Sequence, residues 1–358
     1  MIRNIVFFIQ NFSRSAGSER VTSVVANMLS REGYNVTVLS ICGNNTCFYN
    51  IDEKVRLVTL CNEPEINNRK SFFKVKRRLS SFYKANKTDL VIDVCSALCI
   101  YTLLLKKKFH YKNITWEHFN FTVNSGMNKL GRKYAARKSD YIVTLTEQDK
   151  SFYTDAFPHM RAKITYIYNP SPYKPQNAEC ERENTVISVG RLTTQKGFDR
   201  LIEIWKGIEK ELPDWKMRVF GDGEEKENLK KELLRKNVKN FEFCPATKRI
   251  DEEYKKAKIY VSTSLFEGLP MTMIEAQSFG LPIISYDFIT GPEDIIREGK
   301  NGYIIPDGEG VAFGKAIVRL CKDEGLRKKM SENALADSER FSEENIKNTW
   351  FDLVGSKL

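Results

Sequence analysis

The 358-residue sequence contains no apolar run long enough to cross a bilayer. Its longest apolar runs, NIVFFI and IYTLLL, are far shorter than the roughly 20 residues that a membrane-spanning helix needs. The first residues, MIRNIVFFIQNF, offer no small-residue cleavage site of a secretory signal, so we expect them to form a buried strand. These two absences favour a globular protein that stays in the cytoplasm.

The sequence also lacks the common metal and dinucleotide motifs. Its eight cysteines form no Cys-x-x-Cys pair, and its three histidines complete no zinc pattern. Free thiols in a reducing compartment are therefore expected. No Asp-x-Asp segment could hold a divalent cation, and the Gly-x-Gly-x-x-Gly fingerprint of dinucleotide-binding folds is missing. We expect neither a metal ion nor a resident cofactor.

Positive charge is concentrated in the first half of the chain. Residues 1–170 contain 26 Lys and Arg against 13 Asp and Glu, whereas the remainder contains 31 against 33. This imbalance indicates an anionic partner for the first half: a membrane, a nucleic acid or a phosphorylated substrate. Nucleic acid is disfavoured because no readout module is recognisable.

One basic stretch has the pattern of an amphipathic helix. Residues 69–84, RKSFFKVKRRLSSFYK, place Phe72, Val75, Leu79 and Phe82 on one helical face and most of the cations elsewhere. Together with basic segments within residues 106–138, this pattern is typical of a surface that adsorbs to anionic lipid. A helix that covers a sheet and has a solvated outer face explains the same pattern.

Short apolar runs alternate with amphipathic helical patterns throughout the chain, and their continuous apolar character predicts parallel strands buried on both faces. The strand candidates are residues 4–10, 35–41, 55–60, 89–94, 113–118, 141–146, 163–169, 185–190, 216–223, 240–245, 259–264, 282–287 and 302–306.

A stretch rich in proline and polar residues interrupts this alternation and predicts a linker at residues 171–184. We therefore predict an α/β fold with two Rossmann-like domains, residues 1–170 and residues 185–340. The last segment, residues 341–358, is predicted to be a helix that packs back on the first domain.

Ligands of such sheets bind beyond the carboxyl ends of the strands, so residues there are candidates for a site. Gly17 precedes a helix whose free N–H groups could meet an anion, although a plain turn explains it too. Arg191 and Lys196 follow the strand at residues 185–190 and would suit a diphosphate, unless they are merely solvated loop cations. His118 ends the strand at residues 113–118, where a structural role is also open.

The segment FEGLPMTMIEAQSFGLP, residues 266–282, sets two carboxylates in apolar surroundings. Gly268–Pro270 predicts a turn, with a helix that begins near Pro270 and stops at Gly280. Glu267 then lies on the loop and Glu275 about one and a half turns into the helix, so both can face one ligand. An acid and a nucleophile of a glycoside hydrolase are the alternative. The place of Glu275, on a helix beside phosphate-binding elements, favours hydroxyl binding.

Several motifs in order resemble the retaining glycosyltransferases of family 4: GSER after the first strand, VGRLTTQKGFD, FGDGEEKENLKK, and FEGLPMTMIEAQSFGLPIIS followed by GPEDII. The resemblance spans nearly the whole chain. It implies the GT-B fold, in which an N-terminal acceptor domain and a C-terminal donor domain face each other across a cleft. The family usually has two adjacent glycines where this chain has Ala16 and Gly17, a departure that concerns how closely this loop meets phosphate.

The resemblance implies a role for each candidate residue. Arg191 and Lys196 would neutralise the donor diphosphate, Glu267 would bind hydroxyls of the donor sugar, and Glu275 would bind those of the ribose. His118 would contact the donor sugar near the reacting carbon, which makes His118, Arg191, Lys196 and Glu267 the catalytic set. The remaining donor-binding residues would be Gly17, Gly268, Leu269, Pro270, Met271 and Thr272 around the phosphates and Ile250 beside the uracil.

The motifs EH and TGPEDII are most similar to those of polysaccharide and lipid-linked oligosaccharide enzymes that use UDP-sugars. The resemblance thus implies metal-independent transfer of a hexose or N-acetylhexosamine to a saccharide or polyprenyl-linked saccharide. The anomeric configuration would be retained by front-face attack, and the enzyme would work at the inner side of the membrane. Two alternatives remain: a nucleotide-sugar epimerase or phosphorylase on the same architecture, and a non-catalytic nucleotide-sugar-binding subunit. The first needs additional catalytic groups that the sequence does not place, and the complete set of candidate residues argues against the second.

Overall fold

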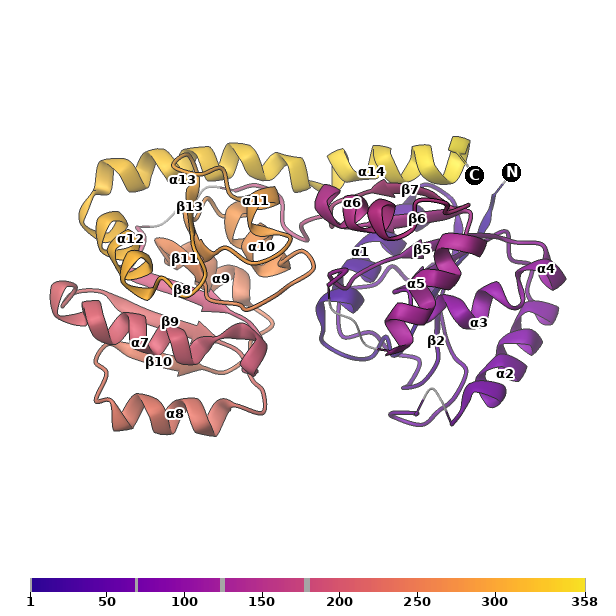
Figure 1. Cartoon of the computed structure of the whole chain (residues 1–358), viewed down its shortest axis with the longest axis horizontal. Coiled ribbons are helices and arrows are strands. Elements are labelled where there is room, and N and C mark those ends of the chain that lie inside the picture. The colour runs from indigo at the N-terminus through magenta and orange to yellow at the C-terminus, as the bar shows by residue number, and fades with distance from the viewer. Residues whose placement is uncertain (1, 68–69, 123–125, 177–180, 358) are drawn as a thin grey trace. The chain divides into compact units, whose positions relative to one another are not determined.

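The computed structural model describes residues 2–67, 70–122, 126–176 and 181–357. The chain folds into two compact units (Figure 1). The first unit comprises Met1–Pro172 together with Glu343–Leu358, and the second comprises Tyr173–Ser342. Among the described residues, no helix combines the length and the apolar character needed to span a bilayer.

The first unit is built on a seven-stranded sheet in the order β3-β2-β1-β4-β5-β6-β7, in which all neighbours are parallel. The strands are β1 (Asn4–Ile9), β2 (Asn35–Ser40), β3 (Arg56–Thr59), β4 (Leu90–Val94), β5 (Lys112–Trp116), β6 (Tyr141–Thr144) and β7 (Lys163–Tyr166). The helices are α1 (Gly17–Arg31), α2 (Phe72–Ala85), α3 (Cys99–Leu103), α4 (Lys106–Phe109), α5 (Gly126–Lys138), α6 (Glu147–Ala156) and α14 (Glu343–Asp352).

Both faces of this sheet are covered, as the continuous apolar strands predict. Val6 and Phe8 of β1 pack in one cluster with Val75 and Leu79 of α2. Phe7 lies between them in sequence and points to the opposite face, where its ring contacts Trp116. Alternate residues of one strand therefore enter two separate apolar layers.

The C-terminal helix α14 packs on the first unit. Its Trp350 is fully buried and meets the Trp116 ring edge-to-face, with centroids 4.9 Å apart. Lys347 forms an ion pair of 2.5 Å with Glu32, just beyond the end of α1. The chain thus returns to its first unit after the second unit is complete.

The second unit contains a six-stranded parallel sheet in the order β10-β9-β8-β11-β12-β13. Its strands are β8 (Thr185–Val189), β9 (Lys216–Phe220), β10 (Phe241–Cys244), β11 (Ile259–Ser262), β12 (Ile283–Tyr286) and β13 (Gly302–Ile305). Its helices are α7 (Phe198–Ile208), α8 (Lys226–Arg235), α9 (Ile250–Lys256), α10 (Met271–Ser278), α11 (Pro292–Ile295), α12 (Gly310–Lys322) and α13 (Glu324–Ser338).

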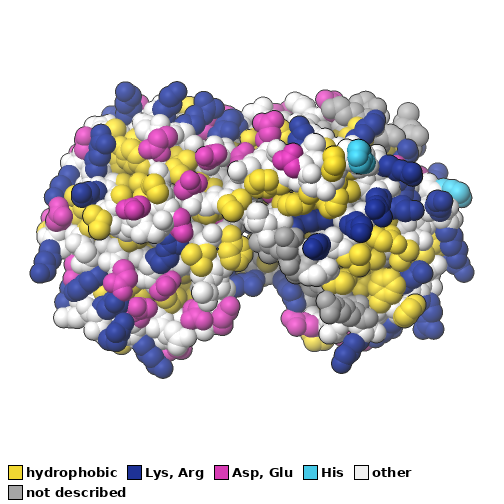
Figure 2. Space-filling model, in the orientation of Figure 1, with side chains coloured by type: hydrophobic (Ala, Val, Ile, Leu, Met, Phe, Trp, Pro, Cys, Tyr) yellow, Lys and Arg dark blue, Asp and Glu magenta, His cyan; other side chains and the backbone are white. Residues whose placement is uncertain are grey.

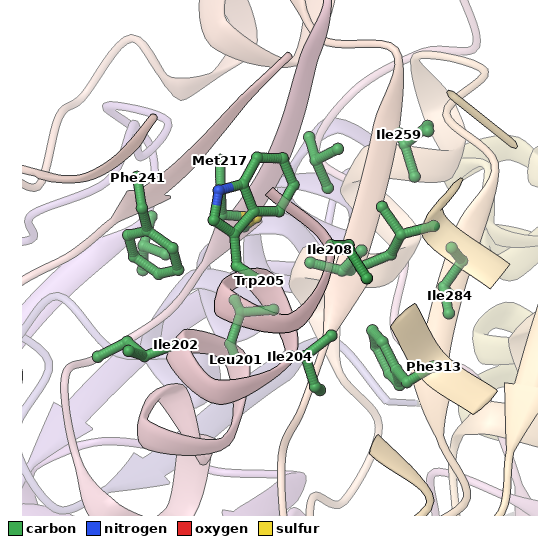
Figure 3. Packing of buried hydrophobic residues seen from close by; sticks show 14 of the residues in the cluster. Leu201, Ile202, Ile204, Trp205, Ile208, Met217, Phe241, Ile259, Ile284 and Phe313 are labelled. Carbon is green, nitrogen blue, oxygen red and sulfur yellow. The ribbon is translucent and has the colours of Figure 1, made fainter. Parts of the chain in front are cut away.

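The core of the second unit forms where α7 packs on this sheet (Figure 3). Leu201, Trp205 and Ile208 recur at helical spacing along α7 and are buried against strand residues such as Met217. The Trp205 indole donates to the Lys239 carbonyl, so its polar atom is satisfied in the apolar layer. Truncation of such a side chain to Ala typically costs about 3–5 kcal/mol.

Every strand predicted from the sequence is present, and the predicted α/β fold of two Rossmann-like domains is confirmed. Of the predicted linker, residues 171–184, residues 177–180 lie outside the described part of the chain. Just before them, the Gln176 amide donates to the Ser278 carbonyl and the Tyr173 ring packs on Phe279. These residues therefore already belong to the second unit.

Candidate active site

The loop after β8 is fixed against the carboxyl end of β11. Thr263, just after β11, donates its hydroxyl to the carbonyls of Lys196 and Gly197, at 3.2 and 2.9 Å. Gly197 has a φ of +61°, and a Cβ there would lie 2.3 Å from the Thr263 carbonyl oxygen. Only glycine fits this close approach, which ends the short 3-10 turn Thr194–Lys196 and starts α7.

This loop brings Lys196 to Glu267, as expected for two members of one site. The Lys196 ammonium lies 2.5 Å from Glu267 Oε1, which also accepts from the Ser264 hydroxyl at 2.8 Å. The two side chains are 18% and 13% exposed, so solvent reaches the pair but does not surround it. Arg191, on the same loop, is exposed.

The turn Gly268–Pro270 is supported by contacts with the segment TGPE, residues 290–293. The Thr290 hydroxyl lies 3.2 Å from the Glu267 carbonyl oxygen and 3.3 Å from that of Gly268. Gly291 has a φ of +111°, and a Cβ there would lie 2.7 Å from the Pro270 ring. These contacts fix the entry to α10, which begins at Met271 as the sequence predicts.

The N-terminus of α10 is a suitable place for an anion. Its first N–H groups have no acceptor within the helix, and the helix dipole is positive at this end. Leu269 is buried, whereas Gly268, Met271 and Thr272 are half-buried. Lys196, which contacts Glu267 just before this turn, adds a positive charge nearby.

Glu275 lies one turn further along α10 and is 1% exposed. Its Oε2 accepts from the Tyr254 hydroxyl of α9 at 3.2 Å. The Tyr260 hydroxyl donates to Thr272 Oγ1 at 2.7 Å, so two tyrosines flank the same face of the helix. Ile250, the first residue of α9, is 7% exposed, and its role beside the uracil stays a prediction.

Two candidate residues belong to the first unit. Gly17 is the first residue of α1 and is exposed, and no atom of the chain lies within 4 Å of a Cβ placed there. His118 follows β5, which ends at Trp116, two residues before the predicted strand end. Its ring lies 4.3 Å from the Trp116 ring between centroids. The residue is half-buried, with its Nε2 atom out of reach of solvent. Burial of the ring lowers the pKa of the imidazole from 6.5 to about 3, so it is neutral at physiological pH.

Arg132 corrects one part of the sequence interpretation. The basic segments within residues 106–138 were expected to add cations to the surface, yet Arg132 is 1% exposed and pairs with Glu117, the neighbour of His118. Sequence reasoning missed this pair because α5 and the end of β5 meet only in the folded unit. Among the described residues, no group of three or more His, Cys, Asp or Glu is arranged to hold a metal ion.

The sequence matches two family descriptions, Glycosyltransferase Family 4 at residues 15–171 and Glycosyl transferases group 1 at residues 171–337. An uncharacterized glycosyltransferase of Haemophilus influenzae is 34% identical over 353 residues, which cover 98% of this chain and 99% of that protein. The chain is a family 4 glycosyltransferase. The amylovoran biosynthesis glycosyltransferase AmsD of Erwinia amylovora is 31% identical over 98% of this chain and 99% of its own length.

Solved structures show the fold of this glycosyltransferase to be GT-B. Anabaena HepE, in complex with UDP and glucose, superposes with a TM-score of 0.82 at 15% identity, over 99% of this chain and 100% of that one. The lipopolysaccharide outer core galactosyltransferase WaaB in its apo form gives a TM-score of 0.75 at 22% identity, again over 99% and 100%. The predicted GT-B fold class is therefore confirmed.

Proposed function

We propose that this glycosyltransferase transfers a hexose or an N-acetylhexosamine from a UDP-sugar to a saccharide or polyprenyl-linked saccharide in the synthesis of cell-surface polysaccharide. The observation that carries the proposal is the contact between Lys196 and Glu267 beside the N-terminus of α10, with Glu275 further along the same helix. The diphosphate of a UDP-sugar is anionic and suits Lys196 and the N-terminus of α10. The sugar and the ribose present hydroxyl groups, which suit the carboxylates of Glu267 and Glu275.

The known relatives support this substrate class. HepE binds UDP and glucose, and AmsD takes part in amylovoran biosynthesis. A Campylobacter jejuni relative, 23% identical over 98% of this chain and of its own length, transfers N-acetylgalactosamine to an undecaprenol-linked saccharide. An extracellular polysaccharide or a lipid-linked precursor of one is therefore the product class that we propose.

The transfer reaction breaks the bond between the anomeric carbon and the diphosphate, and negative charge grows on the leaving phosphate. Lys196, Arg191 and the first N–H groups of α10 would stabilise that charge without a divalent metal. Groups already in place for the developing charge act mainly on the transition state, which is what accelerates the reaction. Glu267 would hold the hydroxyls of the sugar and Glu275 those of the ribose.

We propose retention of the anomeric configuration. The acceptor hydroxyl would attack on the face from which UDP departs, and its proton would leave with the departing phosphate oxygen. No protein nucleophile is then required. His118 would contribute as a neutral imidazole that hydrogen-bonds the donor sugar near the reacting carbon, since burial keeps it uncharged.

Replacement of Lys196 by Ala tests the donor site. We expect Lys196→Ala to lower turnover about 100-fold or more, because one preorganised charge partner of the transition state is lost. Release of the nucleoside diphosphate from a panel of UDP-, GDP- and ADP-sugars is the measurement, and UDP-sugars should be preferred. Lys206→Ala is a matched control, since Lys206 of α7 pairs with Glu209 in the same unit and is not part of the proposed site.

An unchanged rate in Lys196→Ala would contradict the proposed donor site. The same assay separates the alternatives. Binding of UDP-sugars without hydrolysis or transfer would favour a non-catalytic subunit, and interconversion of the sugar without an acceptor would favour an epimerase.

The apolar face of α2 that the sequence offered to lipid packs on the sheet instead, as a sheet-covering helix does. We also propose that the first unit docks on an anionic membrane from the cytoplasmic side, through the outer face of α2 and the segments within residues 106–138. Helices α2, α3 and α5 lie side by side: the Phe72 ring stacks on Tyr101, and Cys99 Sγ contacts the Gly131 carbonyl. Phe73 of α2, Leu104 just after α3 and Leu130 of α5 are 81%, 41% and 47% exposed. Figure 2 shows apolar side chains gathered over this face of the unit with Lys and Arg around them.

A further inference from the structure

The loop that carries His118 is held by a buried charge pair. Arg132 Nε of α5 lies 3.1 Å from Glu117 Oε2, and both side chains are 1% exposed. Removing two charges from water costs more than their attraction returns unless further hydrogen bonds satisfy them. The further hydrogen bonds of Arg132 and Glu117 therefore indicate the structural role of the pair.

The Arg132 guanidinium binds three consecutive carbonyl groups of this loop. Its Nη1 donates to the Phe121 carbonyl, and its Nη2 donates to those of Asn120 and Phe119, at 2.9 and 3.4 Å. The planar, five-donor fork of arginine makes such multiple binding possible, and neither an apolar side chain nor lysine can reproduce it.

The Glu117 carboxylate makes further contacts that hold the same loop. Its Oε1 accepts from the Phe119 amide at 3.2 Å, and its Oε2 accepts from the Tyr153 hydroxyl of α6 at 2.8 Å. Asp149, also on α6, accepts from the Phe121 amide at 3.0 Å. Residues 117–121 have no regular secondary structure, yet their backbone groups are held by side chains from two helices.

We propose that Arg132 is a positioning residue of the transfer reaction, which acts through this loop to hold the His118 imidazole against the Trp116 ring. The inference rests on the proposed role of His118 toward the donor sugar. A displacement of about 1 Å can cost a reacting group roughly 100-fold in rate, so a loop that bears such a group benefits from a rigid support. Residues 117–121 have no backbone ladder of a helix or strand to keep them rigid, so the buried pair provides that support.

A double-mutant cycle between Arg132 and His118 tests the inference. Arg132→Lys keeps the charge but loses the fork, and we expect it to lower kcat about 10-fold with little change in the KM for the UDP-sugar. In the His118→Ala background the same change should lower kcat less than about twofold, because the group on which Arg132 acts is gone. Should Arg132→Lys fail to fold, Tyr153→Phe, which removes only the hydrogen bond to Glu117, is carried through the same cycle.

Arg327→Lys provides a matched control. Arg327 is 9% exposed, lies in the second unit and donates to the consecutive carbonyls of Leu320 and Cys321, remote in sequence from every candidate site residue. We expect its substitution to lower thermal stability and to leave the kcat of the folded enzyme unchanged.

Two outcomes overturn the inference, and they are distinguishable. Equal fold-losses from Arg132→Lys with and without His118 would mean that Arg132 supports the fold alone, while the proposed function would stand. Full activity of His118→Ala would contradict the proposed role of His118 itself and remove the basis of the inference.

Discussion

Burial brings the pKa of the Asp93 carboxyl in β4 close to neutral pH. It is fully buried, and its Oδ2 accepts from Thr102 Oγ1 at 2.8 Å and from Asn113 Nδ2 at 2.7 Å. Burial raises the pKa of Asp93 from 3.8 to about 7, although both hydrogen bonds act in the opposite direction. Two neutral donors do not replace the hydration that an ionised carboxylate loses.

This raised pKa predicts a stability that falls as the pH rises. Between pH 3.8 and about 7 the folded chain keeps the Asp93 proton while the unfolded chain releases it, so the free energy of unfolding decreases across this window. Asp93→Asn should remove this contribution. In urea titrations from pH 5 to 8, the stability of the wild type relative to the variant should decline as the pH rises. Parallel curves would contradict the prediction.

Residues of the candidate site differ in how far the sequence predicts them. Lys196 and Glu267 follow two different strands of one parallel sheet, and the rule that such ends share an edge brings them together. The structure places them 2.5 Å apart. Arg132 was not predicted, because a single arginine in a basic helical stretch has the pattern of a solvated cation. Its burial depends on Glu117, a partner from another element.

At the level of elements, the segment before α11 has a strained backbone residue, Thr290, which contacts the turn that leads into α10. Thr290 has a φ of +65°, a left-handed conformation that is rare for a branched side chain. Such backbone strain costs of order 1–3 kcal/mol and persists only where the surroundings enforce it. Here the Thr290 hydroxyl contacts the carbonyls of Glu267 and Gly268, so the strain coincides with a support of the donor loop.

Thr290→Val tests this support, because it keeps the branched shape and removes the hydroxyl. A net hydrogen bond of about 1 kcal/mol is lost, and we expect the KM for the UDP-sugar to rise roughly fivefold. Thr290→Ser keeps the hydroxyl and should stay close to the wild type. Steady-state kinetics against the donor is the measurement. Equal KM values for the Val and Ser variants would show that the hydroxyl does not support donor binding.

Elements were predicted more reliably than their ends. The continuous apolar runs located every strand, and Pro270 and Gly280 marked the limits of α10, which ends at Ser278 with Gly280 at a φ of +66°. The turn Thr194–Lys196 was not predicted, since it depends on Gly197 meeting the Thr263 carbonyl across the sheet. Local patterns thus predict the elements, whereas contacts between distant segments decide how the connections bend.

For the whole molecule, the division of charge follows the division into units. The excess of Lys and Arg lies within residues 1–170, and the N-terminal part of the first unit ends at Pro172. A neutral second unit and a basic first unit suit an enzyme whose acceptor is attached to an anionic surface. Exposed apolar side chains such as Phe73 add a contribution that salt does not screen.

Sedimentation with vesicles tests the membrane proposal. The protein should bind vesicles rich in anionic lipid more strongly than neutral ones, and increasing salt should release most of it. Each lysine near an anionic surface contributes about 1 kcal/mol, so Lys107→Glu with Lys108→Glu should weaken binding about 10-fold or more.

The second unit offers a control with the same change of charge. Lys328 and Lys329 are adjacent and exposed on α13, as Lys107 and Lys108 are on α4. If the first unit docks on the membrane, reversing the pair on α13 should leave vesicle binding nearly unchanged, because those side chains would remain in water. Equal losses for the two pairs would indicate attraction by net charge alone, and equal sedimentation with neutral and anionic vesicles would exclude the basic surface as the docking site.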